Sequence, residues 1–316
     1  MKILANDGIA NSGKILLEAA GHTVVTETVA QDNLIDAINN ENYEVVLVRS
    51  ATTVRQHVMD SCPNLKMIGR GGVGMDNIDV EYGRSKGLHV FNTPAASSQS
   101  VAELVMTQLF SLVRMTYDAN KEMPENGASN FKVLKKKYGK GVELRGKTIG
   151  IIGFGRIGQS VAQYAMGCGM NVIAHDPFVS KANIKLSIQG KGIEVPIETT
   201  SMEEVLTQSD FLSLHVPKQA DGSAVIGTNE LNSMKDGVYL VNAARGGVIY
   251  EEALISALDS GKVAACALDV FENEPTPNEA ILEHSKIATT PHIGAATLEA
   301  QDRIGEELAN FIIANS

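Results

Sequence analysis

The sequence predicts an α/β protein that contains two doubly wound parallel sheets. Short apolar runs alternate with helical patterns over the first hundred residues, and the same alternation resumes at Lys147. A long helical pattern over Ala95–Tyr117 lies between the two stretches. Because strands that alternate with helices form parallel sheets covered on both faces, each stretch is expected to form its own α/β domain.

The first stretch contains five expected strands, each a short apolar run: Ile3–Ala5, Thr23–Thr26, Val45–Arg49, Lys66–Ile68 and His89–Phe91. Between them lie four patterns of helical periodicity: Ser12–Ala20, Asn33–Asn39, Thr53–Asp60 and Asp79–Ser85. After the long helix, Met123–Gly141 is polar and includes Pro124, Gly127 and the run Lys135–Lys137, so we expect a long loop there.

The second stretch contains six expected strands: Thr148–Ile152, Asn171–His175, Phe211–His215, Tyr239–Asn242, Ala264–Leu268 and Lys286–Thr289. Its expected helices are Arg156–Cys168, Met202–Thr207, Asn229–Met234, Glu251–Ser260 and Leu298–Ile313. The last of these follows the end of the second sheet, so we expect it to pack onto the first domain.

Composition and charge exclude several classes of function. Apolar residues make up 44% of the 316 residues and charged residues 20%, which is typical of a globular protein in water. A net charge of −10 argues against nucleic acid or an anionic membrane as the main partner. Three cysteines without a Cys-x-x-Cys pair favour free thiols in a reducing cytoplasm. We find no signal-peptide pattern, no membrane-spanning apolar run and no zinc-type ligand spacing, so no metal is expected.

A glycine-rich turn predicts a dinucleotide site. Gly153-x-Gly155-x-x-Gly158 follows an apolar strand and opens a helix, and Asp176 ends the next strand. The glycines allow a tight turn, close approach of the pyrophosphate and close helix packing, while the helix N-terminus attracts phosphate. The Asp176 carboxylate would accept bonds from the ribose hydroxyls and repel a 2′-phosphate, which favours NAD over NADP. Arg156 either contacts the pyrophosphate or is a solvated first-turn residue.

Three charged residues of the second half come just after expected strands: Arg245, Glu274 and His292. In an open α/β sheet, ligands bind beyond the carboxyl ends of the strands. All three side chains are therefore expected to point toward the cofactor site. Oxidising a secondary alcohol requires a base for the hydroxyl proton, and an imidazole suits this role near neutral pH.

At these residues the chain resembles the D-isomer-specific 2-hydroxyacid dehydrogenase family, over nearly its whole length. The motifs that match are at residues 49–52, 69–79, 92–94, 153–158, 242–247, 267–271 and 291–297. Within the family the motifs are most similar to those of the phosphoglycerate dehydrogenases. Val73 and Val216 depart from the pattern, because close relatives often carry Thr at both positions.

The resemblance implies roles for the residues. His292 would be the acid/base, Glu274 would bind and orient its other ring nitrogen, and Arg245 would bind the substrate carboxylate. Asp269 would contact the nicotinamide side, although a structural carboxylate after a strand is the alternative. The implied cofactor contacts are Gly153, Gly155, Arg156, Ile157, Gly158, Asp176, His215, Val216, Pro217, Ala243, Ala244, Asp269, Gly294 and Ala295.

A second glycine-rich turn at Gly72, Val73 and Gly74 would, by analogy, hold the substrate carboxylate through backbone N–H groups. Arg49, Ser50 and Arg70 follow first-domain strands and would face the substrate. Two arginines suit a phosphate dianion, although each could instead pair with a nearby acid. Lys135–Lys137 would reach the active site of a partner subunit or be a solvated charge run.

We therefore expect a flavodoxin-like substrate domain at residues 1–97 plus 289–316, and an inserted NAD-binding Rossmann domain at 98–288. The expected reaction is NAD-dependent oxidation of 3-phospho-D-glycerate to 3-phosphohydroxypyruvate, which opens serine synthesis. The alternatives are a glyoxylate or hydroxypyruvate reductase, another D-2-hydroxyacid dehydrogenase, or a non-enzymatic NAD-sensing scaffold of the corepressor type.

We further expect a cytoplasmic homodimer that acts on a small molecule. The helix at Ala95–Tyr117 would be a hinge and dimer contact, or else an internal core helix. Because the sequence stops at residue 316, a short form without the C-terminal regulatory domain is expected, and with it no inhibition by serine through that domain.

Overall fold

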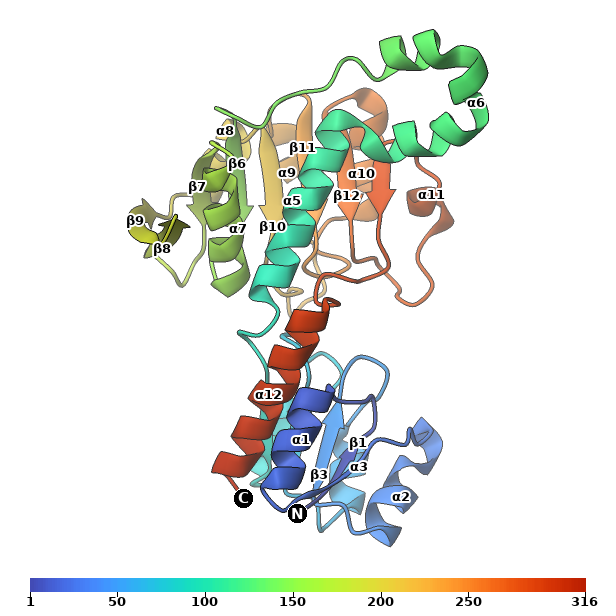
Figure 1. The fold of residues 1–316 in the computed structure, drawn as a ribbon, viewed down its shortest axis with the longest axis vertical. Helices are drawn as coiled ribbons and strands as arrows, with labels where there is room; N and C mark the ends of the chain where they lie inside the picture. The colour runs from blue at the N-terminus through green and yellow to red at the C-terminus, as the bar shows by residue number, and fades with distance from the viewer. The chain divides into compact units, whose positions relative to one another are not determined.

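The computed structural model describes all 316 residues except the side chain of Ile188. The chain forms two compact units (Figure 1). Unit 1 consists of Met1–Ser100 and Ala295–Ser316, and unit 2 is Val101–Gly294. Each unit has one main parallel sheet, so the predicted fold class is confirmed. Among the residues described, no helix combines the length and apolar character that crossing a bilayer requires.

Unit 1 contains a five-stranded parallel sheet in the order β2-β1-β3-β4-β5, the flavodoxin-like order. Its strands are β1 (Lys2–Ala5), β2 (Thr23–Val25), β3 (Val45–Val48), β4 (Met67–Arg70) and β5 (His89–Asn92). Its helices are α1 (Asn11–Ala19), α2 (Leu34–Asn40), α3 (Gln56–Ser61), α4 (Val80–Ser85) and α12 (Leu298–Ala314). All four residues of β3 are buried, because apolar clusters cover both faces of the sheet.

The C-terminal helix α12 belongs to unit 1 and packs against α1. The two helices touch through glycines: a Cβ built on Gly13 would lie 2.3 Å from the Gly305 carbonyl oxygen. Farther along α12, Phe311 stacks on Phe91 of β5, with ring centroids 3.9 Å apart. The last helix therefore completes the core that the first hundred residues begin.

Unit 2 contains a six-stranded parallel sheet in the order β13-β12-β11-β10-β6-β7. The strands are β6 (Thr148–Ile152), β7 (Asn171–His175), β10 (Phe211–Leu214), β11 (Val238–Asn242), β12 (Val263–Leu268) and β13 (Ile287–Thr289). The order reverses between β6 and β10, which makes the carboxyl ends of these strands the topological switch point where ligands bind in such sheets.

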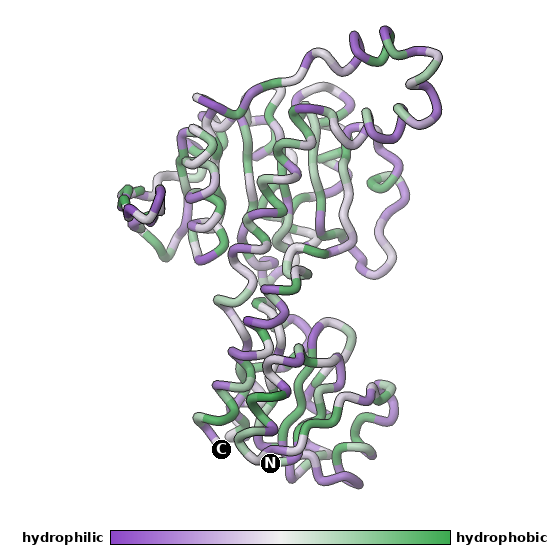
Figure 2. Tube along the Cα trace, in the orientation of Figure 1, coloured by the Kyte–Doolittle hydropathy of each residue, from purple (hydrophilic) through white to green (hydrophobic). Residues whose placement is uncertain are grey.

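Helices cover both faces of this second sheet. One apolar cluster joins it to α5 (Ser98–Arg114) and α7 (Arg156–Gly167), and a second joins it to α8 (Met202–Gln208), α9 (Thr228–Ser233) and α10 (Glu251–Ser260). The short α11 (Glu279–Leu282) precedes β13. Figure 2 shows the apolar residues concentrated on the central strands, as expected for strands buried on both faces.

The loop predicted for Met123–Gly141 is wrong, because α6 (Thr116–Lys137) occupies most of it. The expected single helix Ala95–Tyr117 instead ends at Arg114, and Met115 has a φ of +51°. Pro124 and Gly127 disfavour a helix, but the lysines, glutamates and apolar residues around them favour one. Asn130 is not helical (φ −124°, ψ 21°), so α6 bends there, and its course is visible in Figure 1.

A β-hairpin that the sequence analysis did not predict follows β7. It consists of β8 (Lys181–Ile188) and β9 (Lys191–Glu198), which pair antiparallel. Gln189 and Gly190 form the turn with φ of +50° and +77°, the backbone that two-residue hairpin turns require. The hairpin packs on α7 and β7, and Ile184 and Ile197 are buried.

Candidate active site

The glycine-rich turn of unit 2 has the geometry that a dinucleotide requires. Gly153 has a φ of +91°, and a Cβ there would lie 2.4 Å from the carbonyl oxygen of His215. A Cβ on Gly158 would lie 2.2 Å from the Gly153 carbonyl oxygen, so α7 packs directly on the turn. Gly155 faces open space, and no side chain caps the first N–H groups of α7. These groups are therefore positioned for an anionic ligand.

Asp176 is held beside this turn by backbone N–H groups. Its carboxylate accepts hydrogen bonds from the amides of Phe154 (2.7 Å), Phe178 (2.8 Å) and Val179 (3.0 Å). Because an ionised carboxylate has about four acceptor positions, these bonds fix the group while leaving capacity for a ribose hydroxyl. Arg156 is exposed on the first turn of α7.

His215 lies just after β10 and next to Gly153. Its Nε2 is 2.8 Å from the Ser213 hydroxyl, and its buried Nδ1 has no hydrogen-bond partner among the described residues. Burial lowers the pKa of His215 to about 3, so the imidazole is neutral at physiological pH. An unpaired polar atom, the open space at Gly155 and the uncapped α7 N-terminus together fit a dinucleotide cofactor.

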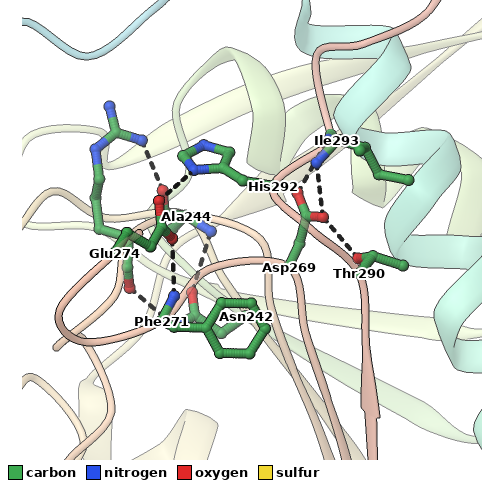
Figure 3. Close-up of polar contacts among 10 residues, drawn as sticks. Asn242, Ala244, Asp269, Phe271, Glu274, Thr290, His292 and Ile293 are labelled. Carbon is green, nitrogen blue, oxygen red and sulfur yellow. Dashed lines mark hydrogen bonds and ion pairs between the residues drawn. The ribbon is translucent and has the colours of Figure 1, made fainter. Parts of the chain in front are cut away.

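His292 and Glu274 form a hydrogen-bonded pair. The Nδ1 of His292 is 2.8 Å from Oε2 of Glu274, and Oε1 of Glu274 accepts a bond from the Phe271 amide (2.9 Å; Figure 3). The Glu274–Pro275 peptide bond is cis, and His292 has a φ of +54°. Because Nδ1 faces the carboxylate, Nε2 is the ring nitrogen that remains for proton transfer. The His292 side chain is 48% exposed, so a ligand can reach it.

Asp269 fixes the loop that bears His292. It is 1% exposed, and its carboxylate accepts bonds from the Thr290 hydroxyl (2.6 Å) and the Ile293 amide (2.9 Å; Figure 3). It also accepts a bond from the Gly294 amide (2.8 Å). These contacts favour the structural alternative for Asp269 over a direct contact with nicotinamide. Thr290, which the sequence analysis missed, also accepts a bond from Gln108 of α5 (3.1 Å).

Arg245 follows β11, on a loop organised by the buried Asn242. The Asn242 amide donates to the Arg245 carbonyl oxygen (2.9 Å) and accepts from the Ala244 amide (3.0 Å), while Nη1 of Arg245 donates to the Ala244 carbonyl oxygen (2.6 Å). A Cβ on Gly246 would lie 1.7 Å from the Phe271 carbonyl oxygen, so this loop abuts the loop of Glu274. The polar Asn242 at the buried end of a strand was the signal that could have revealed its role.

A pocket of about 430 Å³ opens beside the His292–Glu274 pair. Its remaining lining residues are mainly apolar and come from the loops around α11 and β13: Phe271, Pro275, Pro277, Leu282, Thr289, Thr290 and Pro291. His215, Val216 and Pro217 follow β10, and Ala243 and Ala244 follow β11. Unit 2 thus gathers most of the expected cofactor and catalytic residues at the carboxyl ends of its strands.

The expected substrate residues lie in unit 1, around the turn that follows β4. Nη1 of Arg70 lies 2.4 Å from where a Cβ on Gly72 would be, and Cγ of Arg49 lies 3.6 Å from where a Cβ on Gly71 would be. The Gly72 amide donates to the Thr93 hydroxyl (2.9 Å). The amides of Val73 and Gly74 follow in the same turn. Ser50 is exposed.

Other expected residues lie elsewhere. Ala295 begins the second segment of unit 1, directly after Gly294 ends unit 2. Lys137 is exposed and forms an ion pair with Glu122 across the bend of α6.

Comparison with known proteins shows the family. Residues 106–294 match the model of the D-isomer specific 2-hydroxyacid dehydrogenase NAD binding domain. The chain belongs to this family. It is 41% identical over 302 residues to a hydroxypyruvate reductase of Thermotoga maritima, covering 95% of this chain and 92% of that protein. NAD is accordingly its cofactor, and the chain is an NAD-dependent oxidoreductase.

Longer relatives and solved structures are also similar. The chain is 38% identical to a D-3-phosphoglycerate dehydrogenase of Archaeoglobus fulgidus, covering 99% of this chain but 57% of that protein. It thus spans about half the length of the phosphoglycerate dehydrogenases it matches. The crystal structure of the TT0316 protein of Thermus thermophilus superposes with a TM-score of 0.84 at 26% identity, covering 100% of this chain and 97% of that one.

Proposed function

We propose that this chain oxidises 3-phospho-D-glycerate to 3-phosphohydroxypyruvate with NAD, the reaction that opens serine synthesis. The observation that supports a phosphorylated substrate is the convergence of Arg49 and Arg70 on the turn at Gly71 and Gly72. The Arg70 guanidinium lies beside the turn, and the side-chain stem of Arg49 packs against it, so two cationic residues with the backbone amides suit a substrate with two anionic ends. The similarity to D-3-phosphoglycerate dehydrogenases supports the same substrate.

In the proposed mechanism, Arg245 binds the substrate carboxylate and polarises the oxygen on C2. Nε2 of His292 takes the hydroxyl proton, and the Glu274 carboxylate on Nδ1 orients the ring and stabilises the imidazolium that forms. Bound NAD supplies the hydride acceptor for C2. In the reverse direction, the protonated His292 returns the proton to the carbonyl oxygen.

We propose that the cofactor is held by the turn at residues 153–158, with its pyrophosphate at the N-terminus of α7. Asp176 would bind the ribose, and its charge would exclude a 2′-phosphate. The loops after β10, β11 and β13 would hold the nicotinamide end, through residues 215–217, 243–244 and 294–295. Asp269 would support this end indirectly, through the loop that it fixes.

A second candidate is the reduction of hydroxypyruvate or glyoxylate. The similarity to the hydroxypyruvate reductase, which extends over 92% of that protein, favours it. The chemistry at His292, Glu274 and Arg245 would be the same. At the substrate site, the two candidates differ in whether a phosphate is bound.

Steady-state kinetics distinguish the candidates. The kcat/KM of NADH oxidation is measured with 3-phosphohydroxypyruvate, hydroxypyruvate and glyoxylate, and that of NAD reduction with 3-phosphoglycerate, D-glycerate and D-lactate. We expect the phosphorylated substrates to have the highest kcat/KM, and Arg49→Ala or Arg70→Ala to weaken these substrates alone. If 3-phosphohydroxypyruvate is reduced no better than hydroxypyruvate, the phosphate assignment fails and the second candidate replaces it.

We also propose that the enzyme is a cytoplasmic homodimer that acts on small molecules. Free cysteines support a reducing compartment. Large apolar side chains exposed on α5 and α6 support association with a second copy, and they include Phe110, Tyr117, Met123, Phe131 and Val133.

A further inference from the structure

Asn77, in the turn between β4 and α4, joins three segments of unit 1 through one side chain. Its Oδ1 accepts a hydrogen bond from Nε of Arg70 (3.1 Å). Its Nδ2 donates to the carbonyl oxygens of Arg49 (2.8 Å) and Thr52 (2.6 Å). The amide oxygen of Asn77 therefore binds the Arg70 side chain, and the amide nitrogen binds the loop that carries Arg49.

The loop at residues 49–52 is fixed from both sides. On its N–H side, the Asp7 carboxylate accepts bonds from the amides of Arg49 (2.6 Å) and Thr52 (3.1 Å) and from the Thr52 hydroxyl (2.5 Å). On its carbonyl side, Asn77 supplies the two donors. Asp7 therefore fixes the loop alone, whereas Asn77 links it to the side chain of Arg70.

We propose that Asn77 is a positioning residue that fixes Arg49 and Arg70 as a pair around the turn at residues 71–74, and so sets the affinity for the anionic end of the substrate. This inference rests on the proposed function, because it takes both arginines to face the substrate. An amide is required because it offers an acceptor and two donors from one short side chain. An aspartate there would face two carbonyl oxygens and would compete with the substrate for Arg70.

The test replaces Asn77 with Asp and with Ala and measures KM and kcat for 3-phosphohydroxypyruvate and hydroxypyruvate, and KM for NADH. We expect the KM for 3-phosphohydroxypyruvate to rise by about tenfold in Asn77→Ala and by more in Asn77→Asp, as for the loss of a hydrogen bond to a charged group. The kcat and the KM for NADH should stay within about threefold of wild type. A merely structural role would instead change the KM for 3-phosphohydroxypyruvate, kcat and the KM for NADH together, or change none of them.

A matched control is Asn39→Ala. The Asn39 side chain also donates to a backbone carbonyl in unit 1, that of Ser61 (2.9 Å), but it contacts neither arginine. Its KM values should equal those of wild type. If Asn77→Asp does not fold, Asn77→Ser, which keeps a small uncharged polar group, takes its place in the comparison.

A double-mutant cycle separates this inference from the proposed function. If Asn77 acts through Arg70, the double variant Asn77→Asp/Arg70→Ala should have a KM less than about threefold above that of Arg70→Ala, because the effects of substitutions at interacting residues are not additive. A fully additive effect overturns the inference, as does an unchanged KM in both Asn77 variants. If wild type does not prefer the phosphorylated substrate, the proposed function fails, and the same cycle is then measured with the 2-oxo acid that is turned over best.

Discussion

At the scale of single residues, several carboxylates of this chain hold loops in place. Asp7, Asp176 and Asp269 each accept two or three backbone N–H groups near the carboxyl end of a strand, and Glu274 accepts one. A carboxylate with two or three such donors is fixed, and so is the loop that supplies them. The side chains proposed for chemistry, such as His292, lie on loops organised in this way, as pre-organised catalysis requires.

The His292–Glu274 pair yields a direct prediction. His292→Ala should lower kcat by at least about 100-fold, since it removes the acid/base. Glu274→Gln should lower kcat less, because the amide oxygen still accepts the bond from Nδ1 but carries no charge to stabilise the imidazolium. The dissociation constant for NADH, measured from the fluorescence of the protein-bound cofactor, should be the same as that of wild type in both variants. Loss of NADH binding in His292→Ala would show that the residue holds the cofactor instead.

His215 predicts a pH dependence of stability. Burial lowers its pKa to about 3 in the folded state, whereas the unfolded chain binds the proton near pH 6.5. The contribution of His215 to the free energy of unfolding is therefore fully present above pH 6.5 and is lost as the pH falls toward 3. The free energy of unfolding should fall by about 1.4 kcal/mol per pH unit within this window, or about 2 kcal/mol between pH 6.5 and pH 5.

The measurement is urea unfolding followed by circular dichroism, for wild type and His215→Gln at pH 5 to 7. The glutamine variant should lose most of this slope, because its side chain does not titrate. An equal slope in both proteins would assign the pH dependence to other groups.

Residues differ in how far the sequence could predict them. The positions of Arg245, Glu274 and His292 could be inferred, because each lies in a loop that follows an apolar run and strand ends converge at one edge. The hydrogen-bond partners of Asp269 and of the Gly72 amide could not be inferred from the sequence. Which donor meets which acceptor depends on loop geometry over distant segments, such as residues 269 and 290–294, that no local pattern encodes.

At the scale of elements, the strands were predictable and the connections less so. The apolar runs of β3 and β6 are buried on both faces, which leaves a continuous signal. In α6 the signals conflict, since Pro124 and Gly127 oppose a helix that its neighbours favour. The β8–β9 hairpin did have a signal, because polar and apolar residues alternate on both sides of Gln189-Gly190, but a helix was expected to follow β7 in this fold class.

Helix α7 offers a matched pair of substitutions. Gly158→Ala would place a Cβ 2.2 Å from the Gly153 carbonyl oxygen, so the helix must move away from the glycine-rich turn. We expect NAD binding to weaken at least tenfold and the free energy of unfolding to fall by more than about 2 kcal/mol. Gly167→Ala, in the same helix, meets nothing within 4 Å. It should keep NAD affinity and raise stability by about 0.5 kcal/mol, because alanine favours a helix.

Calorimetric titration with NAD and chemical denaturation of both variants test the pair. Equal effects of the two substitutions would mean that close packing of α7 on the turn is not what the cofactor requires.

At the scale of the whole molecule, the residues proposed for acid/base chemistry and those proposed for substrate choice lie in different units. Unit 2 contains the glycine-rich turn and the His292–Glu274 pair, and unit 1 contains Arg49, Arg70 and Asn77. Family membership follows from motifs in both, whereas the structural support for a phosphate comes from unit 1. Variants of Arg49, Arg70 or Asn77 should therefore change which 2-hydroxy acid is used, while variants of His292 or Glu274 should change how fast any of them reacts.

Association of two copies is the remaining proposal at the scale of the whole molecule. Phe131 and Val133, on the second part of α6, are 57% and 64% exposed, an unfavourable state for apolar side chains in water unless a partner covers them. We expect the wild-type protein to have twice the chain mass of 33.7 kDa in light scattering coupled to size-exclusion chromatography. The double variant Phe131→Ser/Val133→Ser should shift toward a monomer. Ile193→Ser, on the β8–β9 hairpin where the side chain is 47% exposed, should leave the mass unchanged. A dimer that survives the α6 substitutions but is lost in Ile193→Ser would place the interface on the hairpin.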